Sequence, residues 1–254
     1  MMNLTAADGH TLSAYQAEPA EAPKGAVVIV HDMFGLTPDM IRTADDLAAQ
    51  GYLTLAPALF DRAAPGTVLS YDEEGFARGL ALIEQIGREP ALNDIQAAVE
   101  AASPAGKVAV IGFSWGGGLA YEAANRLRGA ACVVGFCPLG VLQSGAEKRR
   151  VPTLLHFGAS DPLLPATLVQ PFRDLRPDVS AFSYAGATHG FTSRDRATLH
   201  VGAREQAFAR TQTFIAQYVE GVSPAVLKNA GAYAQAKTER RKGGAAKEEA
   251  GPPA

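Results

Sequence analysis

The sequence predicts an α/β fold in which helices cover both faces of a mainly parallel sheet. Apolar runs without interspersed polar residues, such as 26–30 and 108–111, are typical of strands that are buried on both sides. Stretches with helical periodicity separate these runs, so strand and helix alternate along most of the chain. The full length of 254 residues suffices for one sizeable domain with a large core.

The strands are predicted where short apolar runs are bounded by turn residues. Thr11 to Ala17 follows the turn Asp8-Gly9-His10 and is expected to be an edge strand. The other strands are expected at residues 26–30, 52–55, 107–111, 131–136, 153–157 and 179–184.

The helices are predicted from capping residues and from apolar periodicity. Thr37-Pro38-Asp39 combines a capping hydroxyl, a proline in the first turn and a carboxylate at the positive end of the dipole. Gly51 ends this first helix. Further helices are expected from about residue 73, after Pro90, from Trp115 onward and over roughly 203–218.

The composition changes near residue 221 and divides the chain in two. Residues 1–220 are expected to form the globular domain. Residues 221–254 are rich in Ala, Lys, Glu, Gly and Pro and have few large apolar groups. They are therefore expected to form a mobile tail or a loosely attached helix.

The overall charge and composition exclude several classes of protein. A net charge of -3 does not favour nucleic acid or an anionic membrane as a partner. The start of the chain lacks the basic and apolar regions of a signal peptide, and no apolar stretch reaches the roughly 20 residues of a membrane helix. Cys132 and Cys137 form neither a disulfide framework nor a zinc-ligand pattern. A cytoplasmic location is the default expectation.

A serine flanked by glycines follows the clearest apolar strand. Gly112-Phe113-Ser114-Trp115-Gly116 matches G-x-S-x-G and opens a helix directly after the strand at 107–111. In that setting the small residues permit a tight turn that projects the hydroxyl from the carboxyl end of the strand. The pattern favours Ser114 as a nucleophile; the alternative is a serine that only caps the helix.

A nucleophilic serine needs a base and an acid, and both are expected later in the chain with the acid first. Asp161 follows the strand at 153–157, and His189 lies between the strand ending at Tyr184 and the last helix. The alternatives are a loop aspartate that caps a turn and a surface histidine. His156, inside an apolar strand, is expected to be a core residue.

Attack on a carbonyl also requires donors for the developing negative charge. The backbone N–H of Trp115, next to the serine, is the first expected donor. The second is expected from the loop His31-Asp32-Met33-Phe34-Gly35, at the N–H of Met33. Asp32 is interpreted either as a residue that orients the nucleophile or as a turn residue.

These segments together resemble the dienelactone hydrolase family from about Asp8 to Tyr218. The resemblance rests on the sequences DGHT (8–11), DMFG (32–35), QGY (50–52), APGT (64–67), GFSWGG (112–117) and HGF (189–191). It implies an α/β-hydrolase fold with an eight-stranded, mostly parallel sheet, catalysis without a metal or organic cofactor, and a triad of Ser114, Asp161 and His189.

The chain departs from the best-known family members at the site itself. Those members have a cysteine where this chain has Ser114 and a glutamate where it has Asp32. They bind a substrate carboxylate with two arginines, at positions that align with Ala77 and Ser193 here. Arg78 and Arg194 lie one residue away and are the candidate substitutes, although one residue turns a helical side chain by about 100°.

Several residues near the predicted strand ends are candidate pocket walls. Phe34, Trp115, Phe136, Cys137 and Phe191 share this placement, and core packing is the alternative for each. Cys137 lacks the strand–turn–helix setting of a nucleophile.

The expected function is that of a serine hydrolase acting on a small carboxylic ester, lactone or thioester, as a monomer or homodimer. Two alternatives remain open: a true dienelactone hydrolase (carboxymethylenebutenolidase), or a binding protein that has kept the fold and lost the chemistry.

Overall fold

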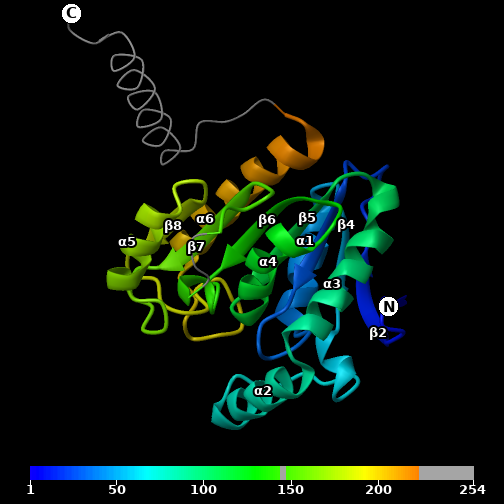
Figure 1. Ribbon diagram of the computed structural model, residues 1–254, viewed down its shortest axis with the longest axis horizontal. Helices are drawn as coiled ribbons and strands as arrows, with labels where there is room; N and C mark the ends of the chain where they lie inside the picture. Colours follow the sequence, from blue (N-terminus) through cyan, green and yellow to red (C-terminus); the bar gives the residue numbers. More distant parts are fainter. Residues whose placement is uncertain (144–146, 223–254) are drawn as a thin grey trace, which may run out of the picture.

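The computed structural model describes residues 1–143 and 147–222, and Figure 1 shows their arrangement. The predicted tail, residues 221–254, lies outside the described residues apart from Gly221 and Val222. Within the described part, no helix is long and apolar enough to cross a membrane.

The described residues form one sheet of eight strands in the order β1-β2-β4-β3-β5-β6-β7-β8. The first two pairings, β1 with β2 and β2 with β4, are antiparallel, and all others are parallel. The strands are β1 Met2–Thr5, β2 Thr11–Ala17, β3 Ala26–Val30, β4 Leu53–Pro57, β5 Val108–Phe113, β6 Ala130–Phe136, β7 Thr153–Gly158 and β8 Ser180–Tyr184.

One strand prediction was wrong. The segment at 11–17 is not at the edge, because β1 pairs with its outer side, with Leu4 opposite Leu12. The four-residue strand β1 carries only one buried side chain, so the sequence around it has too little pattern to reveal it.

The helices are α1 Pro38–Ala49, α2 Glu73–Ile86, α3 Arg88–Ala102, α4 Trp115–Arg126, α5 Ala166–Leu175 and α6 Val201–Ile215. Five helices begin near their predicted starts, and α5 was not predicted. Thr37 caps α1 by accepting from the N–H of Met40. Helix α3 starts two residues before Pro90, since Gly87 separates it from α2 with a φ of 73° and Pro90 is tolerated in the first turn.

The sheet lies between two helical layers, each with its own core (Figure 1). Val27 and Ile29 of β3 face the layer that contains α1 and α6. Val28 and Val30 face the layer of α3 and α4. Since both faces are covered, the central strands are buried along their whole length, which explains their unbroken apolar sequences.

Helix α2 lies beyond the sheet, at the bottom of the view in Figure 1. It packs on the loop that follows β3 through Gly79. A Cβ at this position would fall 2.1 Å from the carbonyl oxygen of Met33. The absent side chain therefore sets how closely α2 approaches that loop.

We predict that Gly79→Ala destabilises the protein by about 1–3 kcal/mol, because the helix or the Met33 backbone must shift to make room. Gly202→Ala is the matched control: nothing lies within 4 Å of the added Cβ in α6, so it should stabilise by up to about 1 kcal/mol. Urea unfolding of both variants measures the two changes. Equal effects of the two substitutions would contradict the close packing of α2.

Candidate active site

Ser114 occupies a sharp turn between β5 and α4. Its backbone has φ 52° and ψ -112°, a conformation that residues other than glycine rarely adopt. Three hydrogen bonds hold this conformation: the Ser114 N–H donates to the carbonyl of Phe136 at 2.8 Å, and its carbonyl accepts from the N–H groups of Leu139 and Gly118 at 3.0 and 3.1 Å. The neighbouring strand and helix thus fix the direction of the hydroxyl.

The two glycines of the motif allow this turn to pack closely. A Cβ on Gly112 would fall 1.9 Å from the carbonyl oxygen of Gly116. A Cβ on Gly116 would fall 2.3 Å from the carbonyl oxygens of both Val30 and His31. Any side chain at either position would push the turn away from β3 and from its own helix.

The structure brings Ser114, His189 and Asp161 into one chain of hydrogen bonds. Ser114 Oγ lies 2.8 Å from His189 Nε2, and His189 Nδ1 lies 2.7 Å from Asp161 Oδ2. The other carboxylate oxygen, Asp161 Oδ1, accepts from the N–H of Leu163 at 2.8 Å. Because Nδ1 donates to the buried carboxylate, Nε2 is left to accept the serine proton.

The loop after β3 begins beside the serine turn, since a Cβ on Gly116 would fall 2.3 Å from the carbonyl oxygen of His31. The N–H groups of Met33 and Trp115 have no hydrogen-bond acceptor within residues 1–143 and 147–222. Trp115 is the first residue of α4, so its amide also carries the partial positive charge of the helix N-terminus. This pair of amides is suited to an oxygen that gains negative charge.

His31 fixes this loop, a role that the sequence did not reveal. The N–H of Leu59 donates to His31 Nε2 at 3.1 Å, so Nδ1 carries the proton and donates to the carbonyl of Asp32 at 2.7 Å. Burial lowers the pKa of His31 to about 4. The ring therefore stays neutral and keeps both bonds at ordinary pH.

Asp32 is buried at the edge of the site, and its carboxylate accepts from the N–H of Phe34 at 2.9 Å. Burial raises its pKa to about 6, opposed by that N–H and by the positive charge of Arg196. Its side chain thus orders the turn and also lines the cavity.

A cavity of about 20 Å³ lies over Ser114. Its lining includes Asp32, Phe136 and Cys137 among the expected residues, together with Met40, Phe113, Gly190, Thr192, Ser193 and Arg196. Cys137 is buried, which raises the pKa of its thiol to about 12. Heteroatoms of Cys137, Asp161 and His189 lie within 4.8 Å of one another, and these are ligand types that bind zinc.

The expected aromatic walls divide into lining and core. Phe136 lines the cavity and stacks on Phe113, with ring centroids 4.9 Å apart. Phe34 lies at the margin, edge-on to Tyr71 at 4.8 Å. The structure places Phe191 in the core against Tyr184, and Trp115 packs its ring on Phe60.

Comparison with known proteins identifies the family. Residues 12–219 match the dienelactone hydrolase family. The chain belongs to that family. A carboxymethylenebutenolidase from Pseudomonas putida is 30% identical over 219 residues, which cover 82% of this chain and 92% of the relative. A carboxymethylenebutenolidase from another Pseudomonas strain is 29% identical over 221 residues, covering 83% and 92%.

Solved structures with the dienelactone hydrolase fold align over nearly the whole domain. A candidate dienelactone hydrolase from Klebsiella pneumoniae has a TM-score of 0.73 at 23% identity, covering 85% of this chain and 98% of the other. A dienelactone hydrolase-like promiscuous phosphotriesterase from metagenomic libraries gives 0.70 at 20% identity, covering 86% and 98%. These likenesses show the shared fold.

The two arginines that the family resemblance suggested do not lie at the cavity. Arg78 is on the exposed side of α2. Arg194 donates to Asp39 at 2.8 Å and to Asp46 at 2.9 Å, and so fastens the loop after His189 to α1. The lining includes a third arginine, Arg196, which the family resemblance did not single out.

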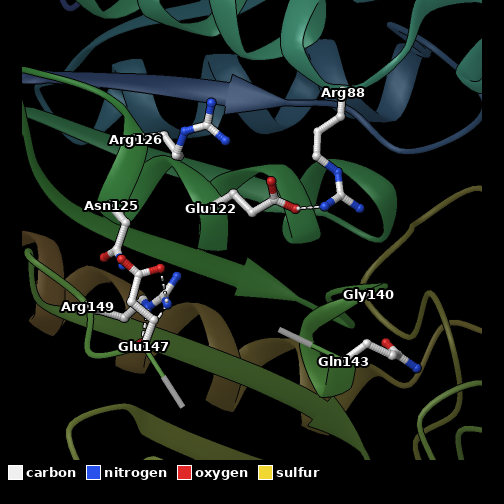
Figure 2. A pocket seen from close by; sticks show the side chains of 8 residues that line it. All are labelled: Arg88, Glu122, Asn125, Arg126, Gly140, Gln143, Glu147 and Arg149. Atoms are coloured by element: carbon white, nitrogen blue, oxygen red, sulfur yellow. Dashed lines mark hydrogen bonds and ion pairs between the residues drawn. The ribbon is translucent and has the colours of Figure 1, made fainter. Parts of the chain in front are cut away.

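A larger hollow, of about 420 Å³, lies elsewhere and is lined by charged residues (Figure 2). Glu122 faces Arg88 across it at 3.1 Å, and Arg149 lies 3.6 Å from Glu147. Glu122 is seven residues along α4 from Trp115, about 10 Å away from the serine turn. Since these charges are paired with each other, the smaller cavity at Ser114 is the candidate site of this dienelactone hydrolase family member.

We predict that Asp32→Asn stabilises the protein at pH 8 by up to about 3 kcal/mol, at 1.36 kcal/mol per pKa unit. The raised pKa means that the folded state holds this proton more tightly than the unfolded state. Wild-type stability therefore falls as the pH rises from about 4 to about 6, and the loss persists above that range. Urea unfolding at pH 8, 6 and 4 should show the variant's advantage shrinking toward acid. An advantage that does not change with pH would contradict the raised pKa.

Proposed function

We propose that the protein is a serine hydrolase that cleaves a small carboxylic ester, lactone or thioester through an acyl-enzyme. The observation that carries this proposal is the continuous hydrogen-bonded chain from Ser114 through His189 to Asp161. The backbone amides of Met33 and Trp115 support it, because neither has an acceptor within the described residues and both can therefore donate to an oxyanion.

In acylation, Ser114 Oγ attacks the carbonyl carbon while its proton passes to His189 Nε2. The C=O electron pair moves to oxygen, and the amides of Met33 and Trp115 stabilise the resulting negative charge. When the intermediate collapses, the bond to the leaving oxygen or sulfur breaks. His189 returns the proton to that atom, and an ester remains on Ser114.

In deacylation, water takes the place of the alcohol and the same steps run in reverse. His189 accepts a proton from water, the hydroxide oxygen bonds to the acyl carbon, and the bond to Ser114 Oγ breaks as the serine regains its proton. Asp161 stays ionised throughout, holds the ring by its Nδ1–H and stabilises the transient imidazolium. In a lactone the leaving alcohol is part of the acyl group, so it stays attached after acylation. Hydrolysis then releases a single hydroxy acid.

We predict that a fluorophosphonate labels Ser114 stoichiometrically and that Ser114→Ala abolishes labelling and lowers kcat for p-nitrophenyl butyrate by at least about 10³-fold. Cys137→Ala is the matched control, since its thiol lines the same cavity and should be dispensable for labelling. Peptide mass mapping locates the label. Labelling that survives in Ser114→Ala would refute the proposal, and labelling of the wild type without ester turnover would favour a binding protein.

A carboxylated lactone, as in carboxymethylenebutenolidase, is the second candidate substrate. Arg196 favours it, because this guanidinium lines the cavity and is a fixed positive charge near Ser114. The identity with the Pseudomonas enzymes points the same way.

We predict that, if this candidate is right, the ratio of kcat/KM for a carboxylated lactone to that for a neutral p-nitrophenyl ester falls about tenfold or more in Arg196→Gln. Arg78→Gln removes an exposed charge and should leave the ratio unchanged. An unchanged ratio in Arg196→Gln would leave a neutral ester as the better assignment.

A further inference from the structure

The cavity over Ser114 is too small for any substrate of the proposed reaction. Its volume is about 20 Å³. Sites for small molecules usually offer about 300–1,000 Å³, so the space over Ser114 is much smaller than a substrate needs. Some group that lines the cavity must move before a carbonyl carbon can reach the serine.

The side chain of Arg196 closes one side of this cavity. Its guanidinium lies against the backbone next to the catalytic histidine: a Cβ on Gly190 would fall 2.3 Å from an Arg196 terminal nitrogen. The guanidinium also lies 5.3 Å from the ring centre of Phe34 and 5.5 Å from that of Tyr71. Arg196 therefore joins three loops: the one after β3, the one before α2 and the one after β8.

Arg196 is held much more weakly than the arginine two residues before it. Within the described residues its side chain makes no hydrogen bond or ion pair. The guanidinium lies against the two aromatic rings and the Gly190 backbone, and its charge attracts the Asp32 carboxylate. Arg194, in contrast, bonds Asp39, Asp46 and Thr43. The loop is thus fastened by one arginine, while the other can leave its place without breaking an ion pair.

A polar group without a partner lies in the same cavity. The Ser193 hydroxyl is buried, and within the described residues it makes no hydrogen bond. The Tyr71 hydroxyl lies close to the Ser193 side chain and donates its own proton to Thr37. Since an unpaired buried hydroxyl is costly, a polar atom of a bound molecule is its natural partner.

We propose that Arg196 is a removable cover on the substrate pocket and so determines which substrates reach Ser114. When it moves off Phe34 and Tyr71, it opens a subsite in which the Ser193 hydroxyl bonds a polar atom of the acyl group. The proposal rests on the proposed hydrolase function. Closure reduces the fraction of molecules that can bind, which raises KM and leaves kcat little changed.

The kinetic test uses Arg196→Ala with p-nitrophenyl butyrate, a neutral ester. We expect KM to fall by about tenfold and kcat to change less than about twofold. Tenfold is the factor by which two cation–π contacts together favour the closed form. Tyr71→Leu removes one of the rings and should lower KM by about threefold, whereas Tyr71→Phe keeps the ring and should not. Arg78→Ala removes an exposed arginine from α2 and is the charge-matched control.

A second readout is independent of catalysis. Cys137 lines the cavity, so its reaction with thiol reagents reports access when Ser114→Ala is the background. Arg196→Ala should speed modification of Cys137 by the bulky reagent DTNB more than by methyl methanethiosulfonate. Cys132, fully buried in β6, is the internal control.

An unchanged or higher KM in Arg196→Ala, together with an unchanged rate of Cys137 modification, would overturn the proposal that Arg196 covers the pocket. If fluorophosphonate labels no variant but Arg196→Ala still exposes Cys137, the proposed function fails and the proposal that Arg196 covers the pocket stands.

For Ser193, the expected result is that Ser193→Ala lowers the ratio of kcat/KM for a methoxyacetyl ester to that for a butanoyl ester about threefold or more. An unchanged ratio would remove Ser193 from the subsite.

Discussion

The backbone of Ser114 is the constraint on which the site depends. A non-glycine residue with φ 52° costs on the order of 1–3 kcal/mol and persists only where its surroundings fix it. Here the carbonyl of Phe136 on the neighbouring strand and the amide of Leu139 supply the bonds. Gly112 and Gly116 supply the space. The strained backbone of Ser114 therefore depends on three strands together. A shift of β3, β5 or β6 would relax this backbone and turn the hydroxyl away from His189.

Parallel strands bring the rest of the site to the same edge. Asp161 and His189 lie on the loops after β7 and β8, and the amide of Met33 lies on the loop after β3. Each loop has its own anchor. His31 holds the loop after β3, the hydrogen bond from the Leu163 N–H to Asp161 holds the loop after β7, and Arg194 holds the loop after β8. Side chains that must keep their geometry are therefore fastened to the scaffold, whereas Arg196, which must yield to a substrate, makes no hydrogen bond or ion pair within the described residues.

The sequence revealed those features that depend on local pattern. The unbroken apolar runs of β3 and β5 and the glycines around Ser114 are required by burial and by close backbone contact, so they predicted the core strands and the serine turn. The proximity of Ser114, His189 and Asp161 followed from strand order alone. Short β1 was missed because one buried side chain gives no periodicity.

The cationic side of the pocket could not be predicted in this way. Arg194 and Arg196 are two residues apart in an irregular loop, and only tertiary contacts decide that one reaches Asp39 while the other covers the cavity. The same holds for Phe136 and Phe191, both at strand ends, of which one lines the cavity and one fills the core. In the sequence, His31 is only one residue of a loop motif. Its structural role follows from the hydrogen bond that the Leu59 N–H donates to its ring.

The most direct test of the account is a crystal structure of the fluorophosphonate adduct. We expect the phosphorus to be bonded to Ser114 Oγ, with the phosphoryl oxygen within about 2.7–3.1 Å of the N–H groups of both Met33 and Trp115. His189 should remain bonded to Asp161. An adduct on another residue, or a phosphoryl oxygen that points away from both amides, would contradict the assignment of this edge of the sheet as the catalytic site.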